Sequence, residues 1–331
     1  MKVVDLKNGI AKEIQDVDIT NINQADVDKI RDVLLKCPIV VIKNQENRSL
    51  PFAQLVHRLG KGNDGHHIHN WDKLYWYEDA SWSEYYQPGT NMPAYPNPMS
   101  WKGESYPVQR VTGAKNDEGI FSGIFQDGRL DWHSNLNNVN HADGVALQGV
   151  ASCEGTQTIW NNTVPALEEM PEDLYEKIRG RYCEYEYVFT KWAGMKSIHQ
   201  MVWMMARHDF VATPGYDRNY RFWLEQTNIG GTKGIYFFPL NNARIEDDKG
   251  RKIYKELREY LYQDKYIYEH NWEPGDIVLS DQLITQHKRP KTKPNWEEVL
   301  QKRLLHRYTF FLSQPEIPKW NNFTNAPQRI K

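Results

Sequence analysis

The chain has 331 residues, of which 40% are hydrophobic and 25% are charged, and its formal net charge is −2 at pH 7. This balance is typical of a globular protein with a substantial core, and it excludes the disordered and fibrous classes. There is no basic excess to attract nucleic acid, no window with the roughly 18 apolar residues that cross a bilayer, and no signal-peptide core, so we expect a cytoplasmic protein without nucleic-acid or membrane partners.

Helices are predicted near the start of the chain. Apolar residues recur at helical spacing over 24–36, and this helix leads into the β-branched run CPIVVIKN at 37–44, which is typical of a buried strand. A second amphipathic helix is predicted over 49–60 and ends at Gly60. From 61 to 105 the chain is rich in His, Asn, Gly, Pro and Trp without a sustained period, which indicates a lid insertion rather than a separate domain.

The rest of the chain alternates between strand-like runs and helices. A second lid insertion is expected near 190–230. Because strands occur in both halves, we expect one β-rich domain of the α+β class over residues 1–331, not a doubly wound sheet. Strands are predicted at 108–113, 119–125, 144–150, 156–162, 183–189, 234–240, within 273–287 and at 302–312, and helices at 164–180, 197–210 and 248–263.

The stretch DWHSNL at 131–136 places a histidine two residues ahead of an asparagine. Successive strand residues point to opposite faces, so His133 and Asn135 are expected to project to the same side. A third donor from another strand would complete one face of an octahedral iron site and leave the opposite face open, as in the two-histidine, one-carboxylate triad of non-haem iron oxygenases. His287, which follows a Pro-Gly-Asp turn, is the candidate for that donor.

The flanking segments form a series of ordered blocks. These are CPIVVIKNQENRSLPFAQLVHRLGKG at the start, LDWHSN and GVALQGVASCEGTQTIWNN in the middle, and GIYFFPLNNARI, NWEPGDIVLSDQLITQH and KRLLHRYTF towards the end. In this order they resemble the taurine dioxygenase-like (TauD/TfdA) family of iron(II)- and 2-oxoglutarate-dependent oxygenases over most of the chain. The resemblance implies a double-stranded β-helix (jelly-roll) core with flanking helices and lid insertions.

The resemblance also implies roles for individual residues. His133 and His287 stand at the iron ligands, and Asn135 stands where the family's aspartate ligand belongs. Thr158 falls at the threonine that contacts 2-oxoglutarate, and Arg303 at the arginine that grips its distal carboxylate. A planar guanidinium suits this task because it offers two parallel donors to a carboxylate.

Two further positions are carried over from the family. Arg307 lies four residues after Arg303 on the same strand face, and it matches an arginine that often meets an anionic group of the substrate. Asp281 matches an aspartate near the distal histidine and is expected to orient it.

Asn135 departs from the family pattern, because a neutral carboxamide binds a hard cation more weakly than a carboxylate does. Asn135 could act as a weak or water-bridged ligand, or swing aside and leave room for a halide, as in family relatives that halogenate. Asp131, two residues before His133, could replace it as ligand. A deliberate Asp-to-Asn change that holds a substrate complex and a catalytically silent, ligand-binding protein are also open.

The expected activity is that of an iron(II)/2-oxoglutarate-dependent dioxygenase. It would use Fe(II), 2-oxoglutarate and O2 to hydroxylate or otherwise oxidise a small molecule while 2-oxoglutarate is decarboxylated to succinate. A halogenase on the same scaffold is the alternative, and the variant triad leaves a non-catalytic binding protein as a third hypothesis. The sequence permits a homo-oligomer, and Arg307 favours a substrate with an anionic group.

Overall fold

The computed structural model describes residues 1–62, 109–114, 130–134, 143–186, 219–237, 239, 244–245, 250–290 and 295–312. Both expected lid insertions fall largely outside these residues, as do the predicted strand at 119–125 and the predicted helix at 197–210. None of the helices in the described part of the chain has the length and apolar content to cross a membrane.

Within the residues that the structure describes, the larger of the two main sheets has eight strands, and hydrophobic clusters pack on it. Its strands are antiparallel except for the parallel pair β2–β3, and β15, β7 and β17 form its centre. In order the sheet contains β1 (Lys2–Leu6), β2 (Ala11–Gln15), β3 (Ile39–Ile42), β15 (Ile277–Asp281), β7 (Gly144–Ala151), β17 (Leu304–Phe311) and β4 (Lys61–Gly62), and β5 (Gln109–Val111) pairs with β17.

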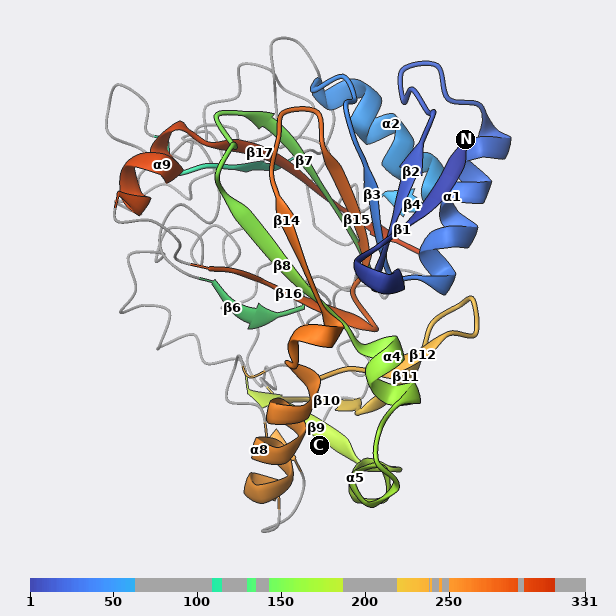
Figure 1. The fold of residues 1–331 in the computed structure, drawn as a ribbon, viewed down its shortest axis with the longest axis vertical. Helices are drawn as coiled ribbons and strands as arrows, with labels where there is room; N and C mark the ends of the chain where they lie inside the picture. The colour runs from blue at the N-terminus through green and yellow to red at the C-terminus, as the bar shows by residue number, and fades with distance from the viewer. Residues whose placement is uncertain are drawn as a thin grey trace, which may run out of the picture.

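A second sheet, with four antiparallel strands in the described part of the chain, faces the first (Figure 1). One hydrophobic cluster joins the two sheets, since it contains Val145, Leu147 and Leu305 from the larger sheet and Trp160 and Tyr268 from the smaller one. The expectation of a β-rich fold with flanking helices is confirmed. The four strands are, in order, β14 (Ile267–Asn271), β8 (Gln157–Asn162), β16 (Thr285–Arg289) and β6 (Leu130–His133).

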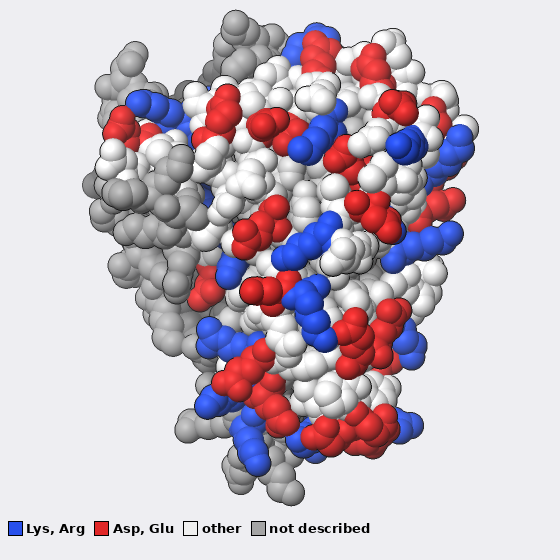
Figure 2. All heavy atoms as spheres, in the orientation of Figure 1, with Lys and Arg blue, Asp and Glu red and all other residues white. Residues whose placement is uncertain are grey.

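Two helices cover the outer face of the larger sheet (Figure 1). They are α1 (Gln24–Lys36) and α2 (Ser49–Leu59), which match the predicted helices. Asn23 caps α1 by accepting a hydrogen bond from the backbone N–H of Asp26. Figure 2 shows that acidic and basic side chains intermingle on the visible face, so no single-sign patch dominates it.

The remaining elements pack at one end of the molecule, around a hydrophobic cluster of their own. The helix predicted over 164–180 is two helices, because Pro171 has no N–H to donate and restricts the residue before it. The elements are α4 (Thr163–Glu168), α5 (Glu172–Ile178), α8 (Gly250–Leu261), the 3-10 turn η3 (Asp264–Tyr266), β9 (Tyr182–Glu186), β10 (Asn219–Trp223), β11 (Glu225–Thr227), β12 (Lys233–Ile235) and β13 (Arg244–Ile245). Elsewhere lie the 3-10 turn η1 (Lys7–Gly9) and α9 (Trp296–Lys302).

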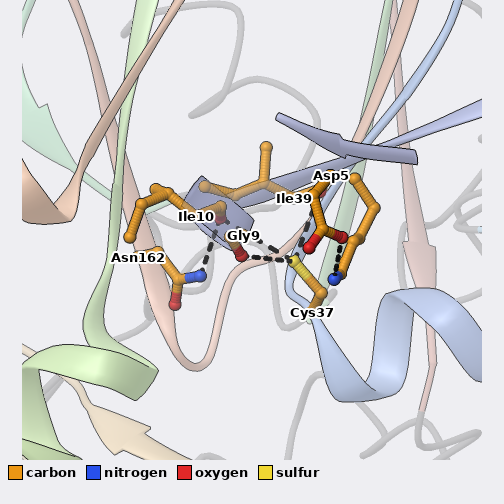
Figure 3. A network of polar contacts seen from close by, with 7 residues as sticks. Asp5, Gly9, Ile10, Cys37, Ile39 and Asn162 are labelled. Carbon is orange, nitrogen blue, oxygen red and sulfur yellow. Dashed lines mark hydrogen bonds and ion pairs between the residues drawn. The ribbon is translucent and has the colours of Figure 1, made fainter. Parts of the chain in front are cut away.

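Asn162, the last residue of β8, ties the smaller sheet to the N-terminal hairpin (Figure 3). Its side-chain N–H donates to the backbone oxygen of Ile10 at 2.8 Å, and its side-chain oxygen accepts from the backbone N–H of Val164 at 3.0 Å, which caps α4. The side chain is buried. One side chain therefore satisfies two buried backbone groups on different elements.

We expect Asn162→Ala to lower the free energy of unfolding by about 2 kcal/mol, since it removes a cap and a buried hydrogen bond. Asn162→Ser keeps a capping oxygen but loses the donor to Ile10, so it should cost about half as much. Urea unfolding measures both, and Asn23→Ser is a control in which the cap chemistry is retained. Equal stability of Asn162→Ala and the parent protein would contradict this role.

Candidate active site

His133 and His287 face each other across the pair of strands β6 and β16. They are directly opposite in the antiparallel register, their ring centroids are 4.3 Å apart, and the ring planes are inclined by 51°. Both side chains are buried, with 9% and 8% of their surface exposed. Two imidazoles far apart in the chain thus meet in the lining of one pocket, where they can share an ion.

A backbone contact determines which nitrogen of His133 is available. Nδ1 lies 2.7 Å from the backbone oxygen of Asp131, which can only accept, so Nδ1 carries the hydrogen. Nε2 of the neutral ring is then the nitrogen that can donate a lone pair to a metal. The ring of His287 packs against the ring of Trp160, with 6.2 Å between centroids and 28° between the ring planes, and this contact restricts the orientation of the imidazole.

Burial keeps both imidazoles neutral. Removal from water lowers the pKa of His133 to about 4 and holds the pKa of His287 well below its ordinary value, and the positive charge of Arg307 acts in the same direction on both. Neutral imidazole is the form that binds metals, so the pair is ready to accept a cation at neutral pH.

A bulge in β6 places Asp131 outside the lining of the pocket. His287 pairs with His133 and Arg289 pairs with Leu130, so three steps along β6 match two along β16. Leu130 and His133 therefore both line the pocket, whereas Asp131 does not. Asp131 was expected to share the face of His133 and to serve as an alternative ligand; that expectation assumed regular alternation, which the bulge interrupts.

The third ligand position is not among the described residues. Asn135 lies outside them, and within the described residues no group of three or more His, Cys, Asp and Glu side chains could hold a metal ion. This also argues against Asp131 as the third ligand. Within the described residues, the pocket can therefore offer a metal ion the two histidines but no third His, Cys, Asp or Glu ligand.

Arg303 is the buried cation of the pocket. It follows α9, directly before β17, its surface is 1% exposed, and none of its three guanidinium nitrogens has a hydrogen-bond partner among the described residues. Burial and the positive charge of Arg289 hold the pKa of Arg303 well below its ordinary value. A buried guanidinium without acceptors costs several kcal/mol, and a bound carboxylate would offset that cost with charge-assisted hydrogen bonds.

Thr158 and Arg307 line the same pocket, which is partly open to solvent and has an empty volume of about 410 Å³ when that open part is included. Thr158 lies on β8 and Arg307 on β17, and both are buried. The structure thus brings five of the seven residues assigned from the sequence to one pocket; these are His133, His287, Thr158, Arg303 and Arg307.

Sequence reasoning missed two cationic residues of this pocket. Lys288 and Arg289 also line it, and Arg289 is 4% exposed. The signal for Arg289 was its place two residues after His287, because alternate residues of a strand share a face. The ammonium of Lys288 lies over the ring of Trp132, 4.4 Å from its centroid, so the cationic groups of the described lining are those of Arg289, Arg303 and Arg307. No acidic side chain is among the described lining residues, which favours an anionic ligand.

Asp281 does not orient His287 through any contact that the structure describes. Its carboxylate accepts hydrogen bonds from the backbone N–H of Leu283 and the side chain of Asn228, both at 2.9 Å, so it stabilises the turn between β15 and β16. Burial, assisted by the negative charge of Asp143, raises the pKa of Asp281 to about 7. Asp281 therefore acts on the turn before His287 and not on the imidazole.

A family model described as "Taurine catabolism dioxygenase TauD, TfdA family" matches residues 2–309 of this chain. The chain belongs to the TauD/TfdA family. It is accordingly a dioxygenase that depends on iron(II), 2-oxoglutarate and O2.

Relatives in this family are distant in sequence. The chain is 24% identical to pentalenolactone F synthase of Streptomyces avermitilis over 221 residues, which cover 63% of this chain and 69% of that protein. It is 21% identical over 162 residues to the alpha-ketoglutarate-dependent 2,4-dichlorophenoxyacetate dioxygenase of a Burkholderia species, covering 47% of this chain and 51% of the relative. These names, a synthase and a dioxygenase, do not support the halogenase alternative.

Solved structures agree with the family assignment at the level of the fold. A taurine dioxygenase from Burkholderia xenovorans superimposes with a TM-score of 0.62 at 17% identity, covering 93% of this chain and 88% of that one. AAD-2, solved with Mn(II) and N-oxalylglycine, gives a TM-score of 0.62 at 15% identity and covers 95% and 98% of the two chains.

The described residues of this TauD/TfdA chain fit the cofactors of its family. Two neutral imidazoles meet in the pocket lining, and the unpartnered nitrogens of Arg303 require an acceptor such as a carboxylate. His133 and His287 would hold iron(II), and Arg303 would hold one carboxylate of 2-oxoglutarate.

The two lowered histidine pKa values predict a pH-dependent stability for the metal-free protein. The unfolded chain takes up protons near pH 6.5, whereas folded His133 does so only near pH 4, so stability is highest above pH 6.5 and falls as the pH drops from 6.5 to 4. The loss from His133 amounts to at most about 3–4 kcal/mol, at about 1.4 kcal/mol per pKa unit. His133→Gln should flatten this dependence in urea unfolding between pH 7 and pH 4.5, and an unchanged slope would contradict the assignment.

Proposed function

We propose that this dioxygenase hydroxylates or otherwise oxidises a small anionic molecule, coupled to the decarboxylation of 2-oxoglutarate to succinate. The single observation that carries the proposal is the pocket itself, where the buried guanidinium of Arg303 and the opposed imidazoles of His133 and His287 face a common space. A guanidinium at one end of the pocket suits the distal carboxylate of 2-oxoglutarate, and a metal bound by the histidines at the other end suits its keto acid group.

The proposal extends to the architecture. The eight-stranded and four-stranded sheets form the two halves of a double-stranded β-helix, or jelly roll, within a single domain over residues 1–331. The insertions near 61–105 and 190–230 serve as lids over the pocket. Support comes from the hydrophobic cluster shared by the two sheets and from the fold of the taurine dioxygenase.

When bound, iron(II) and 2-oxoglutarate supply the oxidising chemistry, in which O2 is consumed and the keto acid loses carbon dioxide. The chain positions these groups. His133 and His287 present lone pairs to the metal, Asn135 is proposed as a weak or water-bridged third ligand, and Arg303 and Thr158 donate hydrogen bonds to the distal carboxylate. Buried apolar side chains such as Leu147 and Leu305 keep water from the pocket.

An anionic substrate is proposed from the excess of positive charge. Arg289 and Arg307 line the pocket besides Arg303, and no acidic side chain is among the described lining residues, so the lining can accommodate a second anionic group beside 2-oxoglutarate. The related dioxygenase named for 2,4-dichlorophenoxyacetate acts on a molecule with a carboxylate, which supports the same substrate class here. We assign the substrate's anionic group to Arg307.

We expect Arg303→Ala to weaken 2-oxoglutarate binding by about 2–3 kcal/mol, which is roughly a 30- to 150-fold rise in Kd, because a charge-assisted hydrogen bond is lost. Calorimetry with Mn(II)-loaded, anaerobic protein measures this without turnover. The Kd of Arg303→Lys should lie between those of the parent protein and Arg303→Ala, since lysine keeps the charge but not the planar pair of donors. Arg31→Ala is the control, as Arg31 donates to backbone oxygens of Leu59 and Leu312 outside the pocket. Unchanged binding in Arg303→Ala would refute the assignment.

Succinate release in the presence of iron(II), 2-oxoglutarate and O2 reports the activity, and a panel of carboxylic and sulfonic acids with their neutral esters or amides identifies the substrate class. We expect acids to stimulate succinate release more than the neutral analogues. Arg307→Ala should raise the KM for the stimulating acid about tenfold or more, because an ion pair in a buried site is lost, and should leave the KM for the keto acid cosubstrate nearly unchanged. Preference for the neutral analogues would contradict the proposal. Mass analysis with chloride or bromide present distinguishes halogenation from hydroxylation.

A further inference from the structure

Thr158 receives a hydrogen bond from a tryptophan that sequence reasoning did not assign to the site. The indole Nε1 of Trp272 donates to the hydroxyl oxygen of Thr158 at 2.9 Å, and both side chains are buried. Thr158 lies opposite His270 in the β8–β14 pair, and Trp272 follows two residues later, just past the end of β14. The indole therefore reaches diagonally across the strand pair to the threonine.

This contact determines how the threonine hydroxyl can act. A hydroxyl has one hydrogen to donate and two lone pairs that accept, whereas an indole N–H only donates. Because Trp272 occupies a lone pair of Oγ1, the hydroxyl hydrogen of Thr158 must point elsewhere. Among the described residues Trp272 is the only hydrogen-bond partner of this hydroxyl, and Thr158 lines the pocket together with Arg303. The hydroxyl is thereby set to donate into the pocket.

The tryptophan is itself held from several sides. Its backbone N–H donates to the backbone oxygen of Thr156 at 3.0 Å, and its ring meets the ring of His270 edge to face at 4.6 Å between centroids. Nε2 of His270 in turn lies 3.0 Å from Oδ2 of the buried Asp276, and its Nδ1 is 3.2 Å from the hydroxyl of Tyr268. An indole fixed in this way has little freedom to release Thr158.

We propose that Trp272 is a positioning residue for the cosubstrate: it holds the hydroxyl of Thr158 as a hydrogen-bond donor, so that this end of the pocket presents only donors to the distal carboxylate of 2-oxoglutarate. The inference rests on the proposed function, which places that carboxylate beside Arg303. Arg303 contributes guanidinium donors and Thr158 contributes one O–H. A donor-only surface favours an ionised carboxylate over a neutral amide or ester, since the latter cannot compensate the buried guanidinium.

The test measures 2-oxoglutarate affinity for Trp272→Phe in three backgrounds, using anaerobic, Mn(II)-loaded full-length protein and calorimetry. In the parent protein and in Thr158→Ser, both of which keep the hydroxyl, we expect Trp272→Phe to raise the Kd about fivefold to tenfold, the effect of roughly one hydrogen bond. In Thr158→Val, which has no hydroxyl to orient, the same substitution should change the Kd less than about twofold. Thr158→Ser should restore the sensitivity that Thr158→Val abolishes.

A matched control separates positioning from general destabilisation. Tyr266→Phe also removes one hydrogen-bond donor, the hydroxyl of a buried tyrosine that contacts Glu169 and Tyr260 away from the pocket. This substitution should lower the melting temperature without changing the Kd for 2-oxoglutarate. An equal effect of Trp272→Phe in all three backgrounds, or no effect in any, would overturn the role of Trp272. If Thr158→Val alone leaves the Kd unchanged, the proposed contact between Thr158 and the cosubstrate fails instead.

Discussion

The opposition of His133 and His287 across two strands is the constraint on which the rest of the site depends. Hydrogen bonding between β6 and β16 places two backbone positions directly opposite each other, and the bulge in β6 turns His133 into the pocket at that point. Burial then keeps both rings neutral, and the contact of His133 with the backbone oxygen of Asp131 selects its free nitrogen. The proposed metal site is thus produced by sheet geometry, which leaves the two side chains little freedom to move apart.

The second constraint is an uncompensated charge. Arg303 is among the most deeply buried residues of the chain, and its nitrogens have no acceptors among the described residues. A protein selected for stability alone would not retain such a group, because desolvation of the guanidinium opposes folding. A bound anion supplies the hydrogen-bond acceptors that the guanidinium of Arg303 lacks, so ligand binding should raise the stability of the folded protein through this residue.

Ordered sequence blocks were sufficient to predict the β-rich fold and to name five residues that converge on one pocket. Each block is a strand of the fold, so the order of the blocks fixes which histidine, threonine and arginine positions meet. Other features were beyond the sequence. Strand alternation predicted that Asp131 shares the face of His133, but a bulge leaves no mark in residue spacing. The helix pattern over 164–180 hid the break at Pro171, although proline is the residue that should have revealed it. The bond from Trp272 to Thr158 joins residues 114 positions apart and follows only from the pairing of β8 with β14.

The central claim is that His133 and His287 bind one ferrous ion, and that 2-oxoglutarate chelates the same ion. Anaerobic titration of iron(II) into protein with 2-oxoglutarate, followed by the visible charge-transfer absorption of the iron–keto acid chelate, tests it most directly. The account predicts saturation at one iron per chain in the parent protein, and loss of the band in both His133→Ala and His287→Ala while each variant remains folded by circular dichroism. Retention of the full band in either variant would show that its imidazole is not an iron ligand and would contradict the account.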